Sequence, residues 1–187
     1  MILEGRDSYT SPSFSLRQRL TRQLWDITWL LLFRPTPRVM HAWRRTLLRA
    51  FGARLGEHVH IHPSVKVWAP WNLTIDSFVG IGEGAVIYSM DKIHIESYAV
   101  ISQGTYLCAG SHDFNSVNMQ LTTSPITIKR HAWLCAQSFV CPGVVIAEGS
   151  VIAARGVVSK SLTDVWAVWA GVPVKRVGNR SQEKAKR

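Results

Sequence analysis

His112 is the side chain in this sequence best suited to acid-base chemistry. It lies in the tripeptide Ser111-His112-Asp113, inside a polar segment that spans residues 109–125. An imidazole changes its charge near neutral pH, so it can accept the proton of a hydroxyl group as that group attacks an electrophile. A histidine in a polar loop is otherwise only solvated, so the role of His112 depends on the elements that position this segment.

Three further histidines alternate along the chain, at positions 58, 60 and 62. Alternation places them on one face of a strand, where imidazoles can bind zinc. Strand alternation alone also produces this pattern, and no fourth ligand is spaced with them. We therefore expect no metal site, and a metal-dependent enzyme remains the alternative interpretation.

The sequence has three cysteines, and each directly follows an aliphatic residue of the repeat described next: Cys108, Cys135 and Cys141. An odd number of cysteines does not complete a set of disulfides. We expect reduced thiols that serve as compact packing residues. A catalytic cysteine is the less favoured interpretation, because none of the three lies in a loop where nucleophiles are usually exposed.

An aliphatic residue returns at every sixth position in successive runs, a spacing that no α-helix produces. The positions are Leu55, Ile61, Val67, Ile75, Ile81, Ile87, Ile95, Ile101, Leu107, Ile128, Leu134, Val140, Ile146, Ile152 and Val158. The first residues of the first three runs, Leu55, Ile75 and Ile95, lie twenty residues apart. Three hexapeptides and two extra residues therefore make one triangular coil. The repeat predicts an all-β parallel β-helix of about five coils, at residues 55–74, 75–94, 95–127, 128–145 and 146–163.

The third of these coils is too long. After Leu107 the repeat stops, and it resumes only at Ile126-Thr127-Ile128. Residues 109–125 must therefore leave the stack as a long loop, and long excursions from a rigid scaffold are commonly functional. This loop carries His112, which is why that histidine is the leading catalytic candidate.

The formal net charge of +10 is confined to the two ends of the chain. Residues 1–54 carry ten arginines and three acidic residues, and residues 175–187 carry six basic residues and one acidic residue. The repeat between them has six basic and eight acidic residues. A continuous basic groove for nucleic acid is therefore not expected.

The basic amino-terminal segment contains two apolar stretches, at residues 24–33 and 38–51. The first has about half the twenty apolar residues that span a bilayer. Both are typical of short amphipathic helices, and we expect residues 1–54 to cap the open first coil. We also expect peripheral contact with an anionic membrane through residues 22–51, with the following rings at the surface: Trp25, Trp29, Phe33 and Trp43.

The coils, the Ser111-His112-Asp113 loop, the Trp133 that follows it and the segment AGVPVK at 170–175 together resemble the left-handed β-helix acetyltransferases. Galactoside and maltose acetyltransferases belong to this group. The most specific similarity is to the colanic acid biosynthesis acetyltransferase family, through HPSVKVWAPWNLTI, ISQGTYLCAGSHD and PITIKRHAWLC. The resemblance covers roughly residues 23–178 and implies a left-handed β-helix of hexapeptide repeats.

The resemblance also implies an activity, namely O-acetylation of a sugar hydroxyl by acetyl-CoA in exopolysaccharide biosynthesis. His112 matches the family's catalytic histidine and would act as general base in a direct transfer. Asp91, at what we take to be an inward position of the preceding coil, would orient His112 or bind the acceptor, although it can equally satisfy its own turn. Tyr88 is a second acceptor-side candidate.

For acetyl-CoA, the resemblance assigns a groove between coils of neighbouring subunits. The matching positions are Trp133, Ala136, Ala154, Ser159, Lys160 and Lys175. Arg155 departs from the family's small residue at this place and would either contact phosphate or block the groove. The implied assembly is a cytoplasmic homotrimer with sites between subunits, in which residues 164–187 form a CoA-contacting segment and a basic tail.

Two functions of other classes stay open at this point. One is a carbonic anhydrase-like β-helix enzyme that uses a metal, and the other is a scaffold for assembly without catalysis. Neither alternative accounts for both the Ser111-His112-Asp113 loop and the AGVPVK segment.

Overall fold

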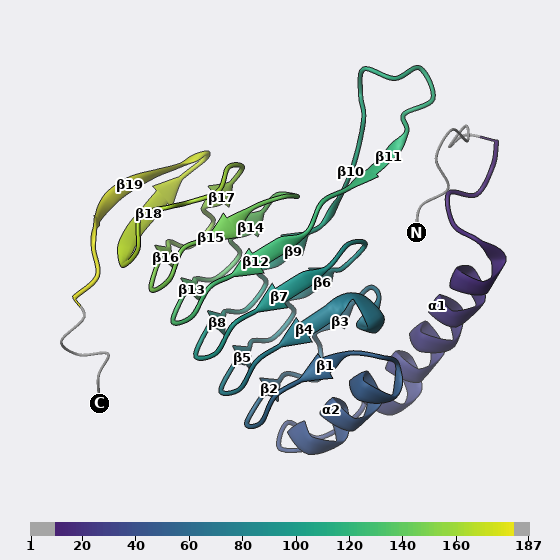
Figure 1. Ribbon diagram of the computed structural model, residues 1–187. Coiled ribbons are helices and arrows are strands. Elements are labelled where there is room, and N and C mark those ends of the chain that lie inside the picture. The colour runs from purple at the N-terminus through teal and green to yellow at the C-terminus, as the bar shows by residue number, and fades with distance from the viewer. Residues whose placement is uncertain (1–9, 182–187) are drawn as a thin grey trace.

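Three faces of short parallel strands wind into a triangular β-helix of five coils, as Figure 1 shows for the computed structural model, which describes residues 10–181. The first face holds β1 (Arg54–Leu55), β4 (Leu73–Ile75), β7 (Ile93–Ile95), β12 (Ile126–Ile128) and β15 (Val145–Ile146). The second holds β2 (His60–Ile61), β5 (Gly80–Ile81), β8 (Val100–Ile101), β13 (Trp133–Leu134), β16 (Val151–Ile152), β18 (Ala167–Gly171) and β19 (Val174–Asn179). The third holds β3 (Lys66–Val67), β6 (Val86–Tyr88), β9 (Tyr106–Cys108), β14 (Phe139–Val140) and β17 (Val157–Val158). The predicted fold class and coil number are confirmed.

The aliphatic residues of the repeat stack on one another from coil to coil. On the first face Ile75 pairs with Ile95, Ile95 with Ile128 and Ile128 with Ile146, and all four are at most 1 % exposed. The six-residue spacing therefore sets both the strand register and the core, because a coil can bury its inner face only against its neighbours.

A ladder of stacked rings runs along one edge of the β-helix, with one ring from each of the first four coils and one from the carboxy-terminal segment. Its members are His58, Phe78, Tyr98, His131 and Trp166. Successive ring centroids lie 5.0, 5.0, 5.0 and 5.8 Å apart. All five residues have φ between 52° and 64°, a left-handed conformation that costs an L-residue about 1 kcal/mol or more. Stacking on the neighbouring rings, on both sides for the three inner members, offsets part of that cost.

The amino-terminal segment forms helix α1 (Leu16–Thr28), which continues into one π-helical turn, η1 (Trp29–Phe33), and then helix α2 (His41–Ala50). A 3-10 turn, η2 (Pro70–Asn72), lies between coils one and two. Helix α1 begins eight residues earlier than the apolar run from 24 onward predicts. The cause is a capping box, in which the Ser15 side chain accepts from the Gln18 backbone N–H and the Gln18 side chain accepts from the Ser15 N–H.

Side chains of the two helices bond to backbone carbonyls of the first coil. Trp25 Nε1 donates to Val67 at 2.7 Å, and Trp29 Nε1 donates to Val65 at 2.8 Å. From α2, Arg44, Arg45 and Arg49 donate to the carbonyls of Ile61, Val59 and Leu55 at 2.8, 3.2 and 2.8 Å. Helices α1 and α2 thus lie over the open end of the stack (Figure 1).

This packing corrects the expected membrane contact of the aromatic rings. Trp25 and Phe33 are 1 % and 0 % exposed inside the core, and Trp29 is partly buried against it. These rings cannot rest on a membrane, because the first coil already covers them. Trp43 is 40 % exposed, and its Nε1 donates to the Leu32 carbonyl at 2.9 Å.

Within residues 10–181, none of the helices combines the length and the apolar character needed to cross a bilayer. The predicted basic tail is only partly described, since residues 182–187 lie outside the described range.

Arg44 is fully buried, and its guanidinium meets four oxygen atoms. Besides the Ile61 carbonyl, these are the Thr36 hydroxyl at 2.7 Å and the carbonyls of Pro37 and Arg38 at 2.9 and 2.6 Å. Because the variant takes a donor from these oxygens and leaves a cavity where the buried guanidinium packs, Arg44→Ala should lower the free energy of unfolding by about 2–4 kcal/mol.

The measurement is urea denaturation, with Arg38→Ala as the matched control, because the Arg38 side chain is exposed. A midpoint for Arg44→Ala equal to that of the control would show that the guanidinium does not hold α2 to the first coil.

Candidate active site

The segment that leaves the third coil is a two-stranded antiparallel ribbon. It consists of β10 (Gly110–His112) and β11 (Leu121–Thr123), and His112 pairs directly with Leu121. The predicted excursion of residues 109–125 is thus present, although the sequence analysis did not foresee its strands. Gly110 begins the ribbon where an added Cβ would collide with Met90 Sδ, so any side chain here would require the Met90 side chain to move.

His112 lies near the end of this ribbon with its side chain exposed, and one ring nitrogen is already engaged. Its Nδ1 lies 2.7 Å from the backbone carbonyl oxygen of Met119. A carbonyl only accepts, so Nδ1 carries the proton in this contact and Nε2 of the neutral ring is left with its lone pair. This tautomer is the one in which Nε2 can act as a base.

The ribbon tip is held by its own hydrogen bonds. The Asp113 side chain accepts from the Asn115 N–H at 3.0 Å, and the Ser116 hydroxyl accepts from the Gln120 N–H at 2.9 Å. Met119 has a φ of 47°, which turns the chain at the residue whose carbonyl meets His112. The ring orientation is therefore fixed by local backbone geometry.

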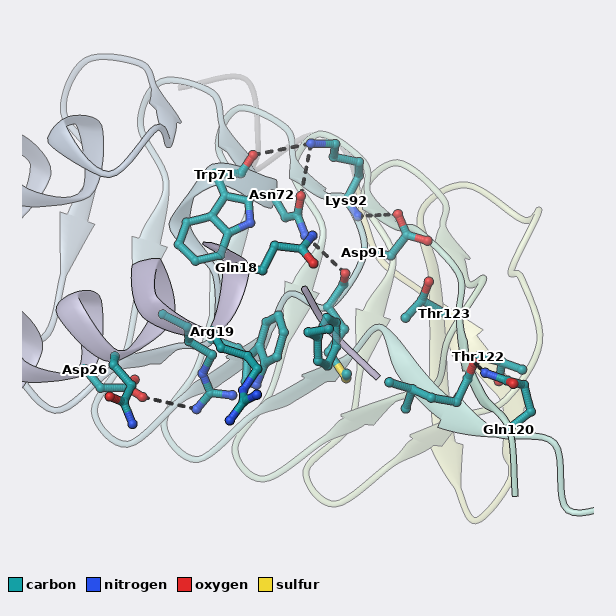
Figure 2. A pocket seen from close by; sticks show the side chains of 16 residues that line it. Gln18, Arg19, Asp26, Trp71, Asn72, Asp91, Lys92, Gln120, Thr122 and Thr123 are labelled. Carbon is teal, nitrogen blue, oxygen red and sulfur yellow. Dashed lines mark hydrogen bonds and ion pairs between the residues drawn. The ribbon is translucent and has the colours of Figure 1, made fainter. Parts of the chain in front are cut away.

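A groove of about 900 Å³ lies between helix α1 and the ribbon. Figure 2 shows Gln18 and Arg19 of α1 on one side and Thr122 and Thr123 of β11 on the other. Its floor comes from the corners of coils one and two. The remaining lining residues are Phe14, Arg22, Gln23, Asp26, Trp68, Trp71, Asn72, Met90, Asp91, Lys92, Gln120 and Leu121. Its volume suits a small polar ligand, and its lining includes Leu121, the direct cross-strand partner of His112.

The groove combines aromatic surface with hydrogen-bonding groups. Arg22 lies over the Trp68 ring, with Cζ 4.6 Å from the centroid, and its Nη2 is 3.3 Å from Asp26 Oδ2. Arg22 Nε is buried and has no protein partner. Lys92 Nζ donates to the Trp71 carbonyl at 3.3 Å and to Asn72 Oδ1 at 3.1 Å. Flat rings beside amide and charged groups are the surfaces on which sugars bind well.

The predicted acceptor residues lie in coil two, but the inward placement of Asp91 is wrong. The inner position belongs to Ser89, whose hydroxyl is buried and donates to the Ala69 carbonyl at 2.9 Å. Asp91 instead lines the groove, and its Oδ1 accepts from the Lys92 N–H at 2.7 Å (Figure 2). Tyr88 lies under the start of the ribbon, edge-on to Trp68 at 5.9 Å, and burial raises the pKa of its hydroxyl.

The residues assigned to the cofactor lie elsewhere on the chain, and none of the six lines this groove. Trp133 is 44 % exposed on β13 and donates to the Ser102 hydroxyl at 2.9 Å. Ala136 and Ala154 occupy equivalent corners of successive coils. Ser159 and Lys160 follow β17, and Lys175 on β19 pairs with Ala170. One chain therefore does not bring the two candidate sets together.

Arg155, which departs from the family pattern, is hydrogen-bonded through both its side chain and its backbone. Its Nε donates to Gln137 Oε1 at 2.8 Å, and its backbone N–H donates to the Ala136 carbonyl at 2.9 Å. The side chain thus lies along the corner that carries Ala136.

The alternating histidines do not converge. His58 stacks on Phe78, and His60 stacks on His41 with centroids 4.7 Å apart. Burial lowers the pKa of His41, whose Nδ1 is 3.1 Å from the Ile61 carbonyl oxygen. In the part of the chain that the structure describes, no group of three or more His, Cys, Asp or Glu side chains could hold a metal ion.

The sequence analysis missed the α1 side of the groove. Gln18, Arg19 and Arg22 precede the apolar run that marked the helix, and the Ser15-Gln18 capping box was the available signal for them. Trp68, Trp71 and Asn72 carry no motif, and only the packing of α1 over the first coil makes them part of a site.

The triangular β-helix of hexapeptide coils is a fold that this chain shares with solved hexapeptide-repeat acetyltransferases. A hexapeptide-repeat acetyltransferase from Vibrio cholerae, solved with acetyl-CoA, matches 91 % of this chain and 92 % of its own at a TM-score of 0.82 and 20 % identity. A galactoside acetyltransferase in complex with coenzyme A matches 100 % and 95 %, with a TM-score of 0.78 and 20 % identity.

The chain belongs to the colanic acid biosynthesis acetyltransferase family and is an acyltransferase. It is 43 % identical over 140 residues to WcaF of Escherichia coli K12, which covers 75 % of this chain and 77 % of the relative. It is 28 % identical over 144 residues to the galactoside O-acetyltransferase of E. coli, covering 70 % and 65 %. Comparison with profiles of known protein families gives no match. The similarity to these two relatives confirms the resemblance drawn from the sequence motifs.

The three cysteines are free thiols and are partly buried. Burial raises the pKa of Cys135 and of Cys141, so both hold less thiolate at a given pH than free cysteine does. At about pH 8, iodoacetamide should therefore alkylate both at least about tenfold more slowly in the folded protein than in the denatured chain.

Mass spectrometry of timed, quenched samples measures these rates, and the denatured chain is the control. Equal rates in the folded and unfolded protein would contradict the burial of these thiols.

Proposed function

We propose that the protein transfers an acetyl group from acetyl-CoA to a sugar hydroxyl of an exopolysaccharide precursor. Family membership alongside WcaF supports the acetyl donor and the polysaccharide context, and a second relative is a galactoside O-acetyltransferase. The observation that carries the proposal is His112, with Nδ1 bonded to the Met119 carbonyl and Nε2 available beside a groove of sugar size.

In this mechanism His112 Nε2 accepts the proton of the attacking hydroxyl. A sugar hydroxyl is a poor nucleophile at neutral pH, so removing its proton during attack lowers the barrier. The oxygen forms a bond to the thioester carbonyl carbon, and backbone N–H groups hold the oxyanion that develops. The carbon–sulfur bond then breaks, and the proton on His112 passes to the departing thiolate.

The Met119 carbonyl contributes both when His112 takes up the proton and when it returns the proton. When His112 gains a proton, Nδ1–H becomes a stronger donor, and the carbonyl at 2.7 Å stabilises the imidazolium that forms. It also keeps the ring from rotating, so Nε2 points the same way for proton removal and for proton return.

The sugar acceptor is assigned to the groove between α1 and the ribbon. Trp68 and Trp71 offer ring surface, and Asp91 accepts from the Lys92 N–H through Oδ1, so that Oδ2 is the carboxylate oxygen for a sugar hydroxyl. Asp91 and Tyr88 are thus retained as acceptor-side residues, with Asp91 in the wall and Tyr88 beneath the ribbon.

The donor is assigned to the surface that carries Trp133, Ala136, Ala154, Ser159, Lys160 and Lys175, with residues 164–187 as the cofactor-contacting segment. These residues do not line the groove of their own chain. A site that combines both sets is therefore assigned to the interface between subunits of a homotrimer, at the cytoplasmic side where acetyl-CoA is available.

The variant His112→Ala should lose transfer by a factor of about 10²–10⁴ in kcat while it binds acetyl-CoA as tightly as the wild type, because only the proton acceptor is removed. Release of free coenzyme A in the presence of a panel of nitrophenyl glycosides measures turnover, and calorimetry measures binding.

Phe114→Ala is the control, since Phe114 is 81 % exposed in the same ribbon and lies outside the groove lining. An undiminished rate for His112→Ala would remove the assignment of the base.

The protein should sediment as a particle of three chains of 21.0 kDa each. Because the two sets of residues meet only across an interface, dilution below the dissociation constant should abolish transfer in proportion to the loss of trimer. Sedimentation velocity and turnover measured over the same dilution series test this expectation, and an active monomer would contradict it.

A further inference from the structure

Helix α1 and the π-helical turn η1 that continues it carry a line of exposed aliphatic side chains on the face that points away from the β-helix. They recur every three or four residues, so they share one side of the helix. We call this set the leucine stripe: Leu16, Leu20, Leu24, Ile27 and Leu31, which are 67, 59, 58, 55 and 62 % exposed. At 1.5 Å per residue, the stripe is about 23 Å long.

The stripe does not help to fasten the helix to the protein. That role belongs to Trp25, Trp29 and Phe33, which pack on the first coil from the opposite side. Replacing the stripe by polar residues would leave those contacts in place. A continuous apolar surface that the fold itself does not need indicates a contact with another molecule or with a membrane.

The charge around the stripe indicates the kind of partner that makes this contact. Residues 10–50 contain eight arginines and one acidic residue, Asp26. On the helical wheel Arg17 and Arg19 flank the stripe, and Arg34 and Arg38 follow its carboxy-terminal end with their side chains exposed. Pairing with the same helix of a second copy would bring these arginines together, which is unfavourable. An anionic surface is favourable instead.

Leucines flanked by arginines are typical of a helix that lies in the interface of a membrane, with its apolar side among the acyl chains and its cations at the headgroups. Trp43 of α2 is 40 % exposed close to the end of α1, since its Nε1 donates to the Leu32 carbonyl. An indole with one polar edge suits the same interface.

We propose that the leucine stripe docks on the surface of a membrane rich in anionic phospholipid, with α1 lying in the plane of that surface. Three of the four aromatic residues predicted for this role, Trp25, Trp29 and Phe33, hold the helix to the first coil instead, and the opposite side of the helix makes the contact.

The position of the groove extends this inference, and this extension rests on the proposed function. Gln18, Arg19 and Asp26 lie on the same helix as the stripe and line the groove (Figure 2). A helix about 10 Å across, resting on a membrane, holds a groove on its flank close to the headgroups. The acceptor that suits this position is a sugar carried on a lipid.

Vesicle flotation of the full-length protein tests the docking surface without acetyl-CoA or an acceptor. The wild type should bind phosphatidylcholine vesicles that contain phosphatidylglycerol and should bind pure phosphatidylcholine vesicles at least about tenfold more weakly. The double variant Leu20→Gln/Leu24→Gln should lose at least about tenfold in affinity for the anionic vesicles.

The matched control is Val165→Gln/Val177→Gln, which replaces two side chains that are 58 and 63 % exposed away from α1. It should bind as the wild type does. Arg17→Gln/Arg38→Gln should weaken binding to anionic vesicles, and added salt should reduce the difference from wild type.

Two results would overturn the proposal. One is unchanged vesicle binding by Leu20→Gln/Leu24→Gln with a wild-type circular dichroism spectrum. The other is a smaller particle in sedimentation for this variant, which would assign the stripe to contact between copies of the chain.

Activity separates this proposal from the proposed function. Leu20 and Leu24 do not line the groove, so the double variant should acetylate a water-soluble nitrophenyl glycoside at the wild-type rate. It should be slower only with oligosaccharide lipids held in vesicles. Absence of transfer in the wild type with every acceptor would count against the proposed function and leave the vesicle result standing.

Discussion

Backbone groups along each coil point alternately toward the preceding and the following coil, and this alternation decides how the β-helix must begin. The N–H groups of Gly56 and His60 in coil one donate to the carbonyls of Ile75 and Val79 in coil two. The carbonyls of coil one that face away from coil two have no coil below them to supply donors, and buried carbonyls without partners are costly. Indole and guanidinium groups from α1 and α2 fill this need. Because those bonds fix where α1 lies, they also fix one wall of the groove.

The six-residue repeat was enough to predict the coils, their register and the core, since each inward aliphatic residue has a partner in the next coil. It failed where a residue's place depends on contacts between distant segments. Asp91 was placed inward by counting, yet the twenty-residue coil has two extra residues, and Ser89 takes the inner position. Trp25 and Phe33 were placed outward because composition alone does not say which side of a short helix meets the protein.

The candidate site, like the fold, could be predicted where it depends on the repeat and could not where it depends on contacts between distant segments. A break in the repeat pointed to His112, because a strict pattern makes any excursion visible. The Met119 carbonyl that sets its tautomer is a backbone group seven residues away, and its position follows from a turn with positive φ that no motif announces. The groove depends on a helix that begins earlier than its apolar run, so Arg22 and Trp68 could not be paired from their order in the sequence.

The stacked coils also act as a ruler. Neighbouring strands in a sheet lie about 4.8 Å apart, so every coil moves the chain forward by one such step. Helix α1 stands on the first coil and the ribbon leaves from the third, and the corner of the second forms the floor between them. The width of the groove is therefore set by the number of coils between α1 and the ribbon, and it can change only in steps of one coil. A relative that inserts or omits one coil ahead of its ribbon would admit a ligand thicker or thinner by one such step, with the same side chains at the edge of the groove.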